Sequence, residues 1–202
     1  MSRSRRRTQD HFGRRARREG FPARSVYKLE EIDRRVRLLR RGQRVLDLGS
    51  SPGSWAIYAA SRVAPEGHVL GVDIKAPTGA LPAHVEHRVL DVFDLDVDEL
   101  GGPGSFDVVL SDMAPSTTGQ RALDQYRSFE LYMRALGLAS VLLRPRGGFV
   151  GKIFQGAEFP EAQAATSALF DKARVLRPDA TRDSSYEVFL VGLGRNDAPP
   201  LA

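Results

Sequence analysis

Lysine is scarce in this sequence, and its few positions are the first candidates for chemistry. The chain of 202 residues holds 26 arginines but only four lysines. A guanidinium stays protonated in proteins, whereas a lysine amine can lose its proton and act as a base. A site that needs a titratable amine must therefore use one of Lys28, Lys75, Lys152 and Lys172. Any single lysine is more often a solvated surface group, so this observation alone does not choose among them.

The loop that begins at Gly49 narrows the class of ligand. Its sequence is Gly-Ser-Ser-Pro-Gly-Ser, with Pro52 before the second glycine, Gly53. It lacks the Gly-x-Gly-x-x-Gly spacing of dinucleotide-binding loops, and no lysine follows it as in the phosphate-binding loop of nucleoside triphosphatases. The sequence disfavours both classes. What remains is a loop that lets a ligand approach the backbone closely.

Acidic residues end three successive apolar segments. Asp73 follows residues 68–72 and lies 24 positions past Gly49, a spacing suited to binding ribose hydroxyls. Asp91 follows a later segment and is suited to an adenine amino group, and Asp112 follows a third. S-adenosylmethionine has both of those groups and a sulfonium cation that an acidic pocket favours. The alternative is that these are aspartates of strand-end turns without a ligand.

A scaffold that gathers the ends of several strands is needed to position these residues. Hydrophobic patterns predict strands over 44–48, 68–72, 85–90, 106–110, 149–154, 173–176 and 186–193. They predict helices over 25–35, with Ser25 as N-cap, and over 54–63, 124–143 and 159–172. This alternation predicts a doubly wound α/β sheet with its ligands at the carboxyl ends of the strands. No crossover helix separates the last two strands, so we expect seven strands, mostly parallel, with one antiparallel.

Composition indicates one soluble domain of ordinary size. The chain has a mass of 22.3 kDa and 42% hydrophobic residues, enough to bury a core. It has no apolar run of about 18 residues and no secretory signal, so we expect a cytoplasmic protein without membrane contact. There is no cysteine, and the four histidines lack metal-ligand spacing, so we expect no metal. The predicted division is a basic arm over 1–24, one domain over 25–195 and a tail over 196–202. We expect the protein to be a monomer.

Positive charge is concentrated at the N-terminus. Residues 1–44 hold 16 basic and five acidic side chains, whereas the rest of the chain carries a net charge of −6. Such a cluster is suited to neutralising the phosphates of a nucleic acid. The alternative is a solvated, partly disordered tail. Within it, His11 and Phe12 could stack on a base, or the aromatic ring could fix the segment to the body of the protein.

Several motifs occur in the order and spacing of one known family. They are Ser-Val-Tyr-Lys-Leu at 25–29, Asp-Leu-Gly-Ser-Ser-Pro-Gly-Ser-Trp at 47–55, Asp-Met-Ala-Pro-Ser at 112–116, Gly-Lys-Ile-Phe-Gln-Gly at 151–156 and Ser-Ser-Tyr-Glu-Val-Phe at 184–189. With these motifs the sequence resembles the FtsJ/RrmJ (RlmE) family of ribose 2′-O-methyltransferases from about residue 10 to residue 195.

The resemblance implies a Rossmann-like class I methyltransferase fold with S-adenosyl-L-methionine as cofactor. The family's Lys-Asp-Lys-Glu tetrad matches Lys28, Asp112, Lys152 and Glu187, and we expect Lys152 to be the general base. The family also implies a cofactor pocket along Gly49, Pro52, Gly53, Trp55, Asp73, Asp91 and Asp112. Bacterial members methylate a uridine in the A loop of 23S ribosomal RNA within the large ribosomal subunit, which is the partner we expect.

The sequence departs from the family pattern at two places. Ser54 replaces a glycine at the start of a predicted helix, where we expect it to act as a cap. Asp-Gln-Tyr at 124–126 differs from the commoner sequence in a region where we expect substrate contacts. Two other functions stay open: methylation of tRNA ribose, and a non-catalytic RNA-binding factor in ribosome assembly. A small-molecule methyltransferase is disfavoured by the basic arm and by the lack of a cap domain.

Overall fold

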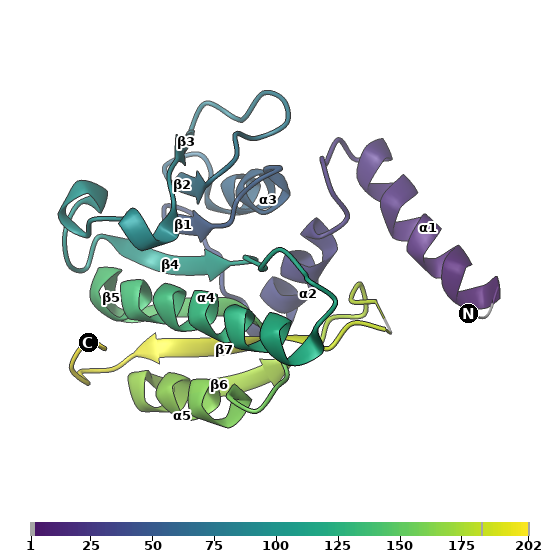
Figure 1. The fold of residues 1–202 in the computed structure, drawn as a ribbon. Helices are drawn as coiled ribbons and strands as arrows, with labels where there is room; N and C mark the ends of the chain where they lie inside the picture. The colour runs from purple at the N-terminus through teal and green to yellow at the C-terminus, as the bar shows by residue number, and fades with distance from the viewer. Residues whose placement is uncertain (1–2, 183, 202) are drawn as a thin grey trace.

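A seven-stranded sheet forms the centre of the computed structural model, which describes residues 3–182 and 184–201, with the backbone alone for residues 3–10 (Figure 1). The strand order is β3-β2-β1-β4-β5-β7-β6, and β7 is antiparallel to both of its neighbours while the other pairs are parallel. The strands are β1 (Arg44–Leu48), β2 (His68–Asp73), β3 (Val85–Val89), β4 (Phe106–Ser111), β5 (Leu143–Phe154), β6 (Phe170–Leu176) and β7 (Glu187–Arg195). The predicted mostly parallel sheet with one antiparallel strand is confirmed.

Helices cover both faces of this sheet (Figure 1). One core cluster joins α2 (Val26–Val36) and α3 (Ser54–Val63) to the sheet, and another lies under α4 (Arg121–Leu142) and α5 (Phe159–Leu169). Successive side chains of a strand point to opposite faces of the sheet. In β1, Val45 accordingly belongs to the cluster under α2 and α3, and Leu46 to the cluster under α4 and α5. Two short 3-10 helices, η1 (Val92–Asp94) and η2 (Asp98–Leu100), follow β3. Because both faces are covered, the exposed edge at the carboxyl ends of the strands is where a ligand can reach the backbone.

Several predicted boundaries are wrong for identifiable reasons. The strand predicted over 149–154 already begins at Leu143, which pairs with Phe106 of β4. The helix predicted to run to residue 172 ends at Leu169, because Phe170 is buried in β6 and stacks on Phe149 of β5 with 6.2 Å between ring centroids. The helix predicted to begin at Asp124 begins at Arg121. Asp124 instead accepts hydrogen bonds from the backbone N–H groups of Thr118 and Gly119, and so fixes the preceding loop.

Neither serine that we expected to act as a cap does so. Ser25 occupies the N-cap position of α2 but makes no capping hydrogen bond with its side chain. Gly53 is the N-cap residue of α3, and Ser54 follows it as the first helical residue. The hydroxyl of Ser54 accepts a hydrogen bond from the backbone N–H of Ala23 at 2.7 Å. It thereby holds the segment that leads into α2.

The basic N-terminal segment forms a helix, α1 (Arg3–Arg18), drawn in purple at one side of the molecule (Figure 1). Its second half contacts the body of the protein: Phe12 lies 5.5 Å from the ring of Tyr27, and Ala16 is buried. Arg15 pairs with Glu19 at 2.8 Å and lies over the Tyr27 ring. Of the two alternatives left open for Phe12, these contacts support the one in which its ring fixes the segment to the body of the protein.

The division into arm, domain and tail stays a prediction. Residues 1–2 of the arm and residue 202 of the tail lie outside the described residues. At the C-terminal end, Ala198 and Leu201 pack against the core cluster under α4 and α5. No helix in the described part of the chain is both long enough and apolar enough to cross a membrane.

Candidate active site

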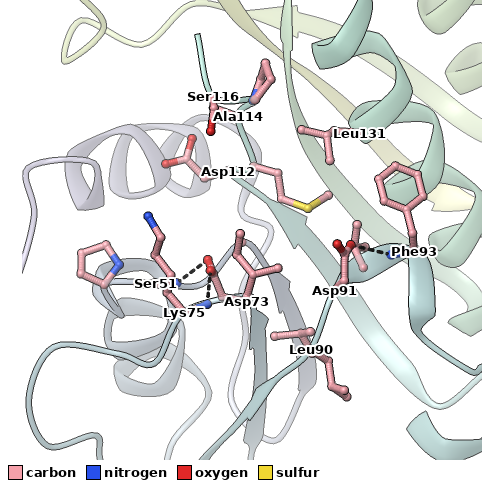
Figure 2. A pocket seen from close by; sticks show the side chains of 17 residues that line it. Ser51, Asp73, Lys75, Leu90, Asp91, Phe93, Asp112, Ala114, Ser116 and Leu131 are labelled. Carbon is pink, nitrogen blue, oxygen red and sulfur yellow. Dashed lines mark hydrogen bonds between the residues drawn. The ribbon is translucent and has the colours of Figure 1, made fainter.

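A cavity of about 610 Å³ opens at the carboxyl edge of the sheet (Figure 2). It lies at the ends of β1, β2, β3 and β4, which bring together five residues of the predicted cofactor set: Gly49, Pro52, Asp73, Asp91 and Asp112. Pockets of this size accommodate small organic ligands. Three carboxylates in one lining favour a ligand that carries positive charge.

Backbone donors hold the first two of these carboxylates in place. The Asp73 side chain accepts hydrogen bonds from the N–H of Ser51 at 3.0 Å and the N–H of Lys75 at 2.8 Å (Figure 2). Asp91 accepts one from the N–H of Phe93 at 3.0 Å, which starts η1. An ionised carboxylate has about four acceptor sites. Each side chain is thus oriented by the fold and retains acceptor capacity for hydroxyl or amino groups.

Gly49 is required by a close approach of two loops. Its φ is +76°, in the left-handed region, and a Cβ atom at this position would lie 2.6 Å from Cγ of Met113. It would also lie 3.0 Å from the Cα atom of Met113, which cannot move as a side chain does. The loop after β1 therefore packs directly on the segment after β4, and both line the cavity.

Two residues expected along the pocket do not line the cavity. Trp55 is buried, donates from its indole N–H to the carbonyl of Ser25 at 2.9 Å, and lies 5.8 Å from the ring of Phe189. Gly53, the N-cap residue of α3, has a φ of +114°, and a Cβ atom at this position would lie 3.2 Å from Cδ2 of Leu81. Trp55 therefore contributes to the core and Gly53 to the turn into α3, and neither belongs to the cavity lining.

Apolar lining residues were missed by sequence reasoning. Ile74, Leu90 and Phe93 line the cavity although they are exposed, at 64%, 39% and 55%. Exposed apolar side chains gathered at one opening are typical of a binding surface. Their position in the sequence could have identified them, because each lies within two residues of Asp73 or Asp91. They provide flat apolar walls for a ring beside the acidic groups.

The structure brings Lys152 and Asp112 together at the rim of the cavity. The Lys152 Nζ atom lies 3.0 Å from the carboxylate oxygen Oδ1 of Asp112 and donates a hydrogen bond to the carbonyl of the same residue. The Lys152 side chain is only 7% exposed. A buried amine held by one partner has a defined direction, which a reacting base needs.

Lys28 and Glu187 form a second ion pair beside the first. Lys28 comes from α2, Glu187 is the first residue of β7, and their side chains are 12% and 13% exposed. In the antiparallel ladder Lys152 pairs with Phe189 and Glu187 pairs with Phe154, so Lys152 and Glu187 are diagonal neighbours on one face. The four residues of the expected tetrad therefore lie at one place. The other two lysines differ: Lys75 lines the cavity and Lys172 is exposed on β6.

The three residues at 124–126 have different surroundings. Asp124 is buried in the loop contacts described above, and Gln125 donates from its amide to the carbonyl of Gln155. Tyr126 is 48% exposed. Among these three side chains Tyr126 is the one open to a substrate.

Asp47 of β1 is a buried acidic group that sequence reasoning did not single out. It is 0% exposed, and neither of its oxygens has a hydrogen-bond partner among the described residues. Burial, and next the negative charges of Asp112 and Asp73, raise the pKa of Asp47 well above its usual range. The folded protein thus holds a proton on Asp47 more tightly than the unfolded chain does.

We expect Asp47→Asn to stabilise the ligand-free protein increasingly as the pH rises. A carboxyl group whose pKa is higher in the folded than in the unfolded protein contributes stability that is fully present at a pH below its unfolded-state pKa. This contribution is lost as the pH rises through the folded-state pKa, and the asparagine variant has no such loss. A tenfold difference in proton affinity between the folded and unfolded states corresponds to about 1.4 kcal/mol, or a change in Tm of about 2–4 °C in a domain of this size. Melting curves of both proteins between about pH 5 and about pH 8 test this. A difference in Tm that does not change with pH would contradict it.

Comparisons with known proteins identify the family of this chain. The sequence model of the FtsJ-like methyltransferase family matches residues 21–195. A protein named ribosomal RNA large subunit methyltransferase E from Sorangium cellulosum (strain So ce56) is 51% identical over 189 residues, 94% of this chain and 89% of its own length. A protein of the same name from Myxococcus xanthus (strain DK1622) is 44% identical over 193 residues, with coverage of 94% and 90%.

Solved structures show the same fold at low sequence identity. A structure described as a ribosomal RNA methyltransferase from Plasmodium falciparum has a TM-score of 0.75 at 21% identity and covers 87% of this chain and 98% of its own. The 1,6-didemethyltoxoflavin-N1-methyltransferase of Burkholderia thailandensis, solved with S-adenosylhomocysteine, has a TM-score of 0.58 at 17% identity, with coverage of 86% and 78%.

The family match spans the cavity, the loop after β1 and both ion pairs. Membership in a methyltransferase family and an acidic cavity of suitable size support S-adenosylmethionine as the cofactor. No cluster of three or more metal-ligating side chains occurs in the parts of the chain that the structure describes. On the extent of the sequence match and the identity of its relatives, the chain belongs to the FtsJ-like methyltransferase family.

Proposed function

We propose that this protein transfers a methyl group from S-adenosylmethionine to the ribose 2′-hydroxyl of a uridine in the A loop of 23S ribosomal RNA. It would act as a monomer on the large ribosomal subunit in the cytoplasm. The observation that carries the proposal is the pairing of Lys152 with Asp112 at the rim of the acidic cavity, beside the pair Lys28 and Glu187. Relatives named ribosomal RNA large subunit methyltransferase E, at 51% and 44% identity, support the choice of RNA.

The cavity fits the cofactor group by group. S-adenosylmethionine supplies a methyl group activated by a sulfonium cation. Asp73 is positioned to accept hydrogen bonds from ribose hydroxyls, and Asp91, among Leu90 and Phe93, to accept from an adenine amino group. Asp112 adds negative charge at the side of the cavity where Lys152 lies. These residues would hold the cofactor on the side of the cavity where Asp112 connects to the tetrad.

Lys152 acts as the general base in this proposal. When bound, S-adenosylmethionine would supply its activated methyl group to the ribose 2′-oxygen, with S-adenosylhomocysteine as the product, and the Lys152 amine would accept the proton that this hydroxyl gives up. A neutral amine is required at the start, and an ammonium results. Asp112 lies 3.0 Å from Nζ of Lys152, so its charge stabilises that ammonium and its carbonyl directs the amine.

Lys28 and Glu187, beside Lys152 and Asp112, are proposed to position the ribose. Their ion pair connects α2 to β7, and Lys28 lies 5.8 Å from the centre of the Phe189 ring, which pairs with Lys152 across the ladder. An ammonium at this position can donate hydrogen bonds to the attacking oxygen or its neighbour. Because methyl transfer between prearranged partners gains mainly from proximity and orientation, we assign this pair a positioning role.

The exposed arginines of α1 are proposed to contact RNA phosphates. We expect the triple variant Arg14→Gln, Arg17→Gln, Arg18→Gln to weaken RNA binding and to flatten its dependence on salt. Each lost phosphate contact reduces the slope of log K against log salt by about 0.7–0.9. Titration of labelled RNA at several salt concentrations measures this slope.

A matched control removes the same charge elsewhere. Arg40, Arg41 and Arg146 are exposed near the starts of β1 and β5, the sheet edge opposite the cavity, so their replacement by Gln should leave the slope unchanged. Equal slopes for both triple variants and the wild type would show that α1 does not bind RNA.

Transfer of labelled methyl groups to three substrates in parallel tests the proposed function. The substrates are large ribosomal subunits that lack the modification, naked 23S RNA, and tRNA. Alkaline cleavage requires a free 2′-hydroxyl, so a resistant linkage at one uridine of the A loop is the expected product. Label in tRNA alone would support ribose methylation but would show that the substrate is tRNA and not 23S RNA. Absence of label despite cofactor binding would favour the assembly-factor alternative.

A further inference from the structure

One arginine of α4 holds the turn that forms a wall of the cavity. The guanidinium of Arg134 donates hydrogen bonds to the backbone carbonyls of Val92 at 2.9 Å, Leu95 at 2.9 Å and Phe93 at 3.5 Å. A guanidinium presents several N–H donors in one rigid plane, so a single side chain can bind a whole turn of backbone. Arg134 is partly buried and is not among the residues that line the cavity. It connects η1 to α4 without belonging to the cavity lining.

The turn held by Arg134 carries the acidic and aromatic groups of that wall. Phe93 lines the cavity, and Asp91 directly precedes η1 as its N-cap residue. The Asp91 side chain accepts a hydrogen bond from the N–H of Phe93 at 3.0 Å, drawn as a dashed line in Figure 2. The direction of the Asp91 carboxylate therefore depends on the position of η1, and through η1 on Arg134.

The surroundings of η1 explain why this turn needs a directional contact. It has only three residues and lies outside the sheet, so the strand ladder does not hold it. Val92 and Leu95 are each 6% exposed and belong to the core cluster under α4 and α5. Such apolar packing is non-directional, whereas hydrogen bonds to three carbonyls of one turn also fix its orientation. Loss of Arg134 would leave η1 attached to the core but less fixed in orientation.

We infer that Arg134 is a positioning residue for the adenine ring of the cofactor, because it holds η1 where Asp91 can accept a hydrogen bond from the 6-amino group. This inference rests on the proposed contact between Asp91 and adenine. If η1 occupies that position only part of the time, the apparent affinity falls with the fraction of molecules in which it does. A ligand without the 6-amino group gains nothing from the contact, so it is affected less.

Two ligands distinguish this role from a general structural one. They are S-adenosylhomocysteine and its analogue in which hydrogen replaces the 6-amino group of adenine. We expect Arg134→Ala to raise the Kd of S-adenosylhomocysteine by about tenfold and that of the analogue by less than about threefold. Arg134→Lys can still donate to part of the three carbonyls and should show an intermediate loss. Calorimetric titration without RNA measures both Kd values, so the result does not depend on which RNA is the substrate.

A matched control removes an arginine from the same helix. Arg127 is exposed on α4, and Arg127→Ala should bind both ligands as the wild type does. Melting curves of each variant show whether the protein is folded at the temperature of the titration. An equal loss of affinity for both ligands in Arg134→Ala would mean that Arg134 supports the fold in general, and the inference would be wrong.

Asp91→Ala separates failure of this inference from failure of the proposed contact. This variant should lose the preference for S-adenosylhomocysteine over the analogue. Because Arg134 acts through Asp91, adding Arg134→Ala to Asp91→Ala should not change the ratio of the two Kd values further. If Asp91→Ala loses the preference and Arg134→Ala keeps it, the contact stands and the inference is wrong. If Asp91→Ala keeps the preference, both the contact and the inference are wrong.

Discussion

Lys152→Ala is expected to lower the rate of methyl transfer by about 10³-fold and to leave the Kd for S-adenosylmethionine within about twofold. Removal of a general base typically costs about 10²–10⁴-fold in rate. The amine lies at the rim of the cavity, against Asp112, and is not among the residues that line it. Single-turnover methyl transfer to unmodified large subunits, together with calorimetric titration of the cofactor, measures both quantities.

Lys152→Arg separates loss of the base from loss of charge. A guanidinium can keep an ion pair with Asp112 but does not give up its proton at accessible pH. This variant should therefore be nearly as inactive as Lys152→Ala. Lys172→Ala removes an exposed lysine from β6 and should retain full activity. An active Lys152→Arg enzyme would show that position 152 acts through its charge, and the base would have to be sought elsewhere.

Asp73→Ala is expected to weaken cofactor binding by about 100-fold. A hydrogen bond to a charged group contributes about 1.5–3 kcal/mol, and each 1.4 kcal/mol corresponds to about tenfold in affinity. The substitution also removes the acceptor that joins the loop at Ser51 to the segment at Lys75, so the cavity wall loses a connection. Titration calorimetry of the purified protein gives the change in Kd.

Comparison of two ligands shows which part of the cofactor Asp73 binds. S-adenosylmethionine and S-adenosylhomocysteine share the ribose, but only the former carries the sulfonium charge. Contact with the ribose predicts equal losses for both ligands, whereas a purely electrostatic effect predicts a loss mainly for S-adenosylmethionine. Asp171→Ala, at an exposed position of β6, is the control for removal of one negative charge. Unchanged affinity of Asp73→Ala for both ligands would remove Asp73 from the cofactor site.

Sequence reasoning predicted the elements of this fold better than their junctions. The strands are short apolar runs bounded by turn residues, a pattern that depends on neighbouring positions alone. The start of β6 at Phe170 depends instead on burial against Phe149, more than 20 positions earlier in the chain. The two serine caps were wrong for a related reason. Ser54 binds Ala23 rather than its own helix, and no local pattern contains that contact.

For the candidate site, too, sequence reasoning could not predict contacts between residues that are far apart in the chain. Strand-end aspartates could be located because the ends of parallel strands meet at one edge. The tetrad required the family resemblance, because Lys28 and Glu187 are far apart in sequence and meet through the packing of α2 on β7. Asp47 is surrounded by apolar positions of β1, and only the folded environment shows that its carboxyl is isolated.

The first turn of α3 has a consequence for the order in which ligands bind. Ser54 and Trp55 follow the loop that lines the cavity, and both hold the segment leading into α2, through Ala23 and Ser25. A displacement of the loop would act on that segment through these two hydrogen bonds. If the bound cofactor changes the affinity for RNA by some factor, bound RNA must change the affinity for the cofactor by the same factor. These two hydrogen bonds make the protein a candidate for cooperative, rather than independent, loading of its two substrates.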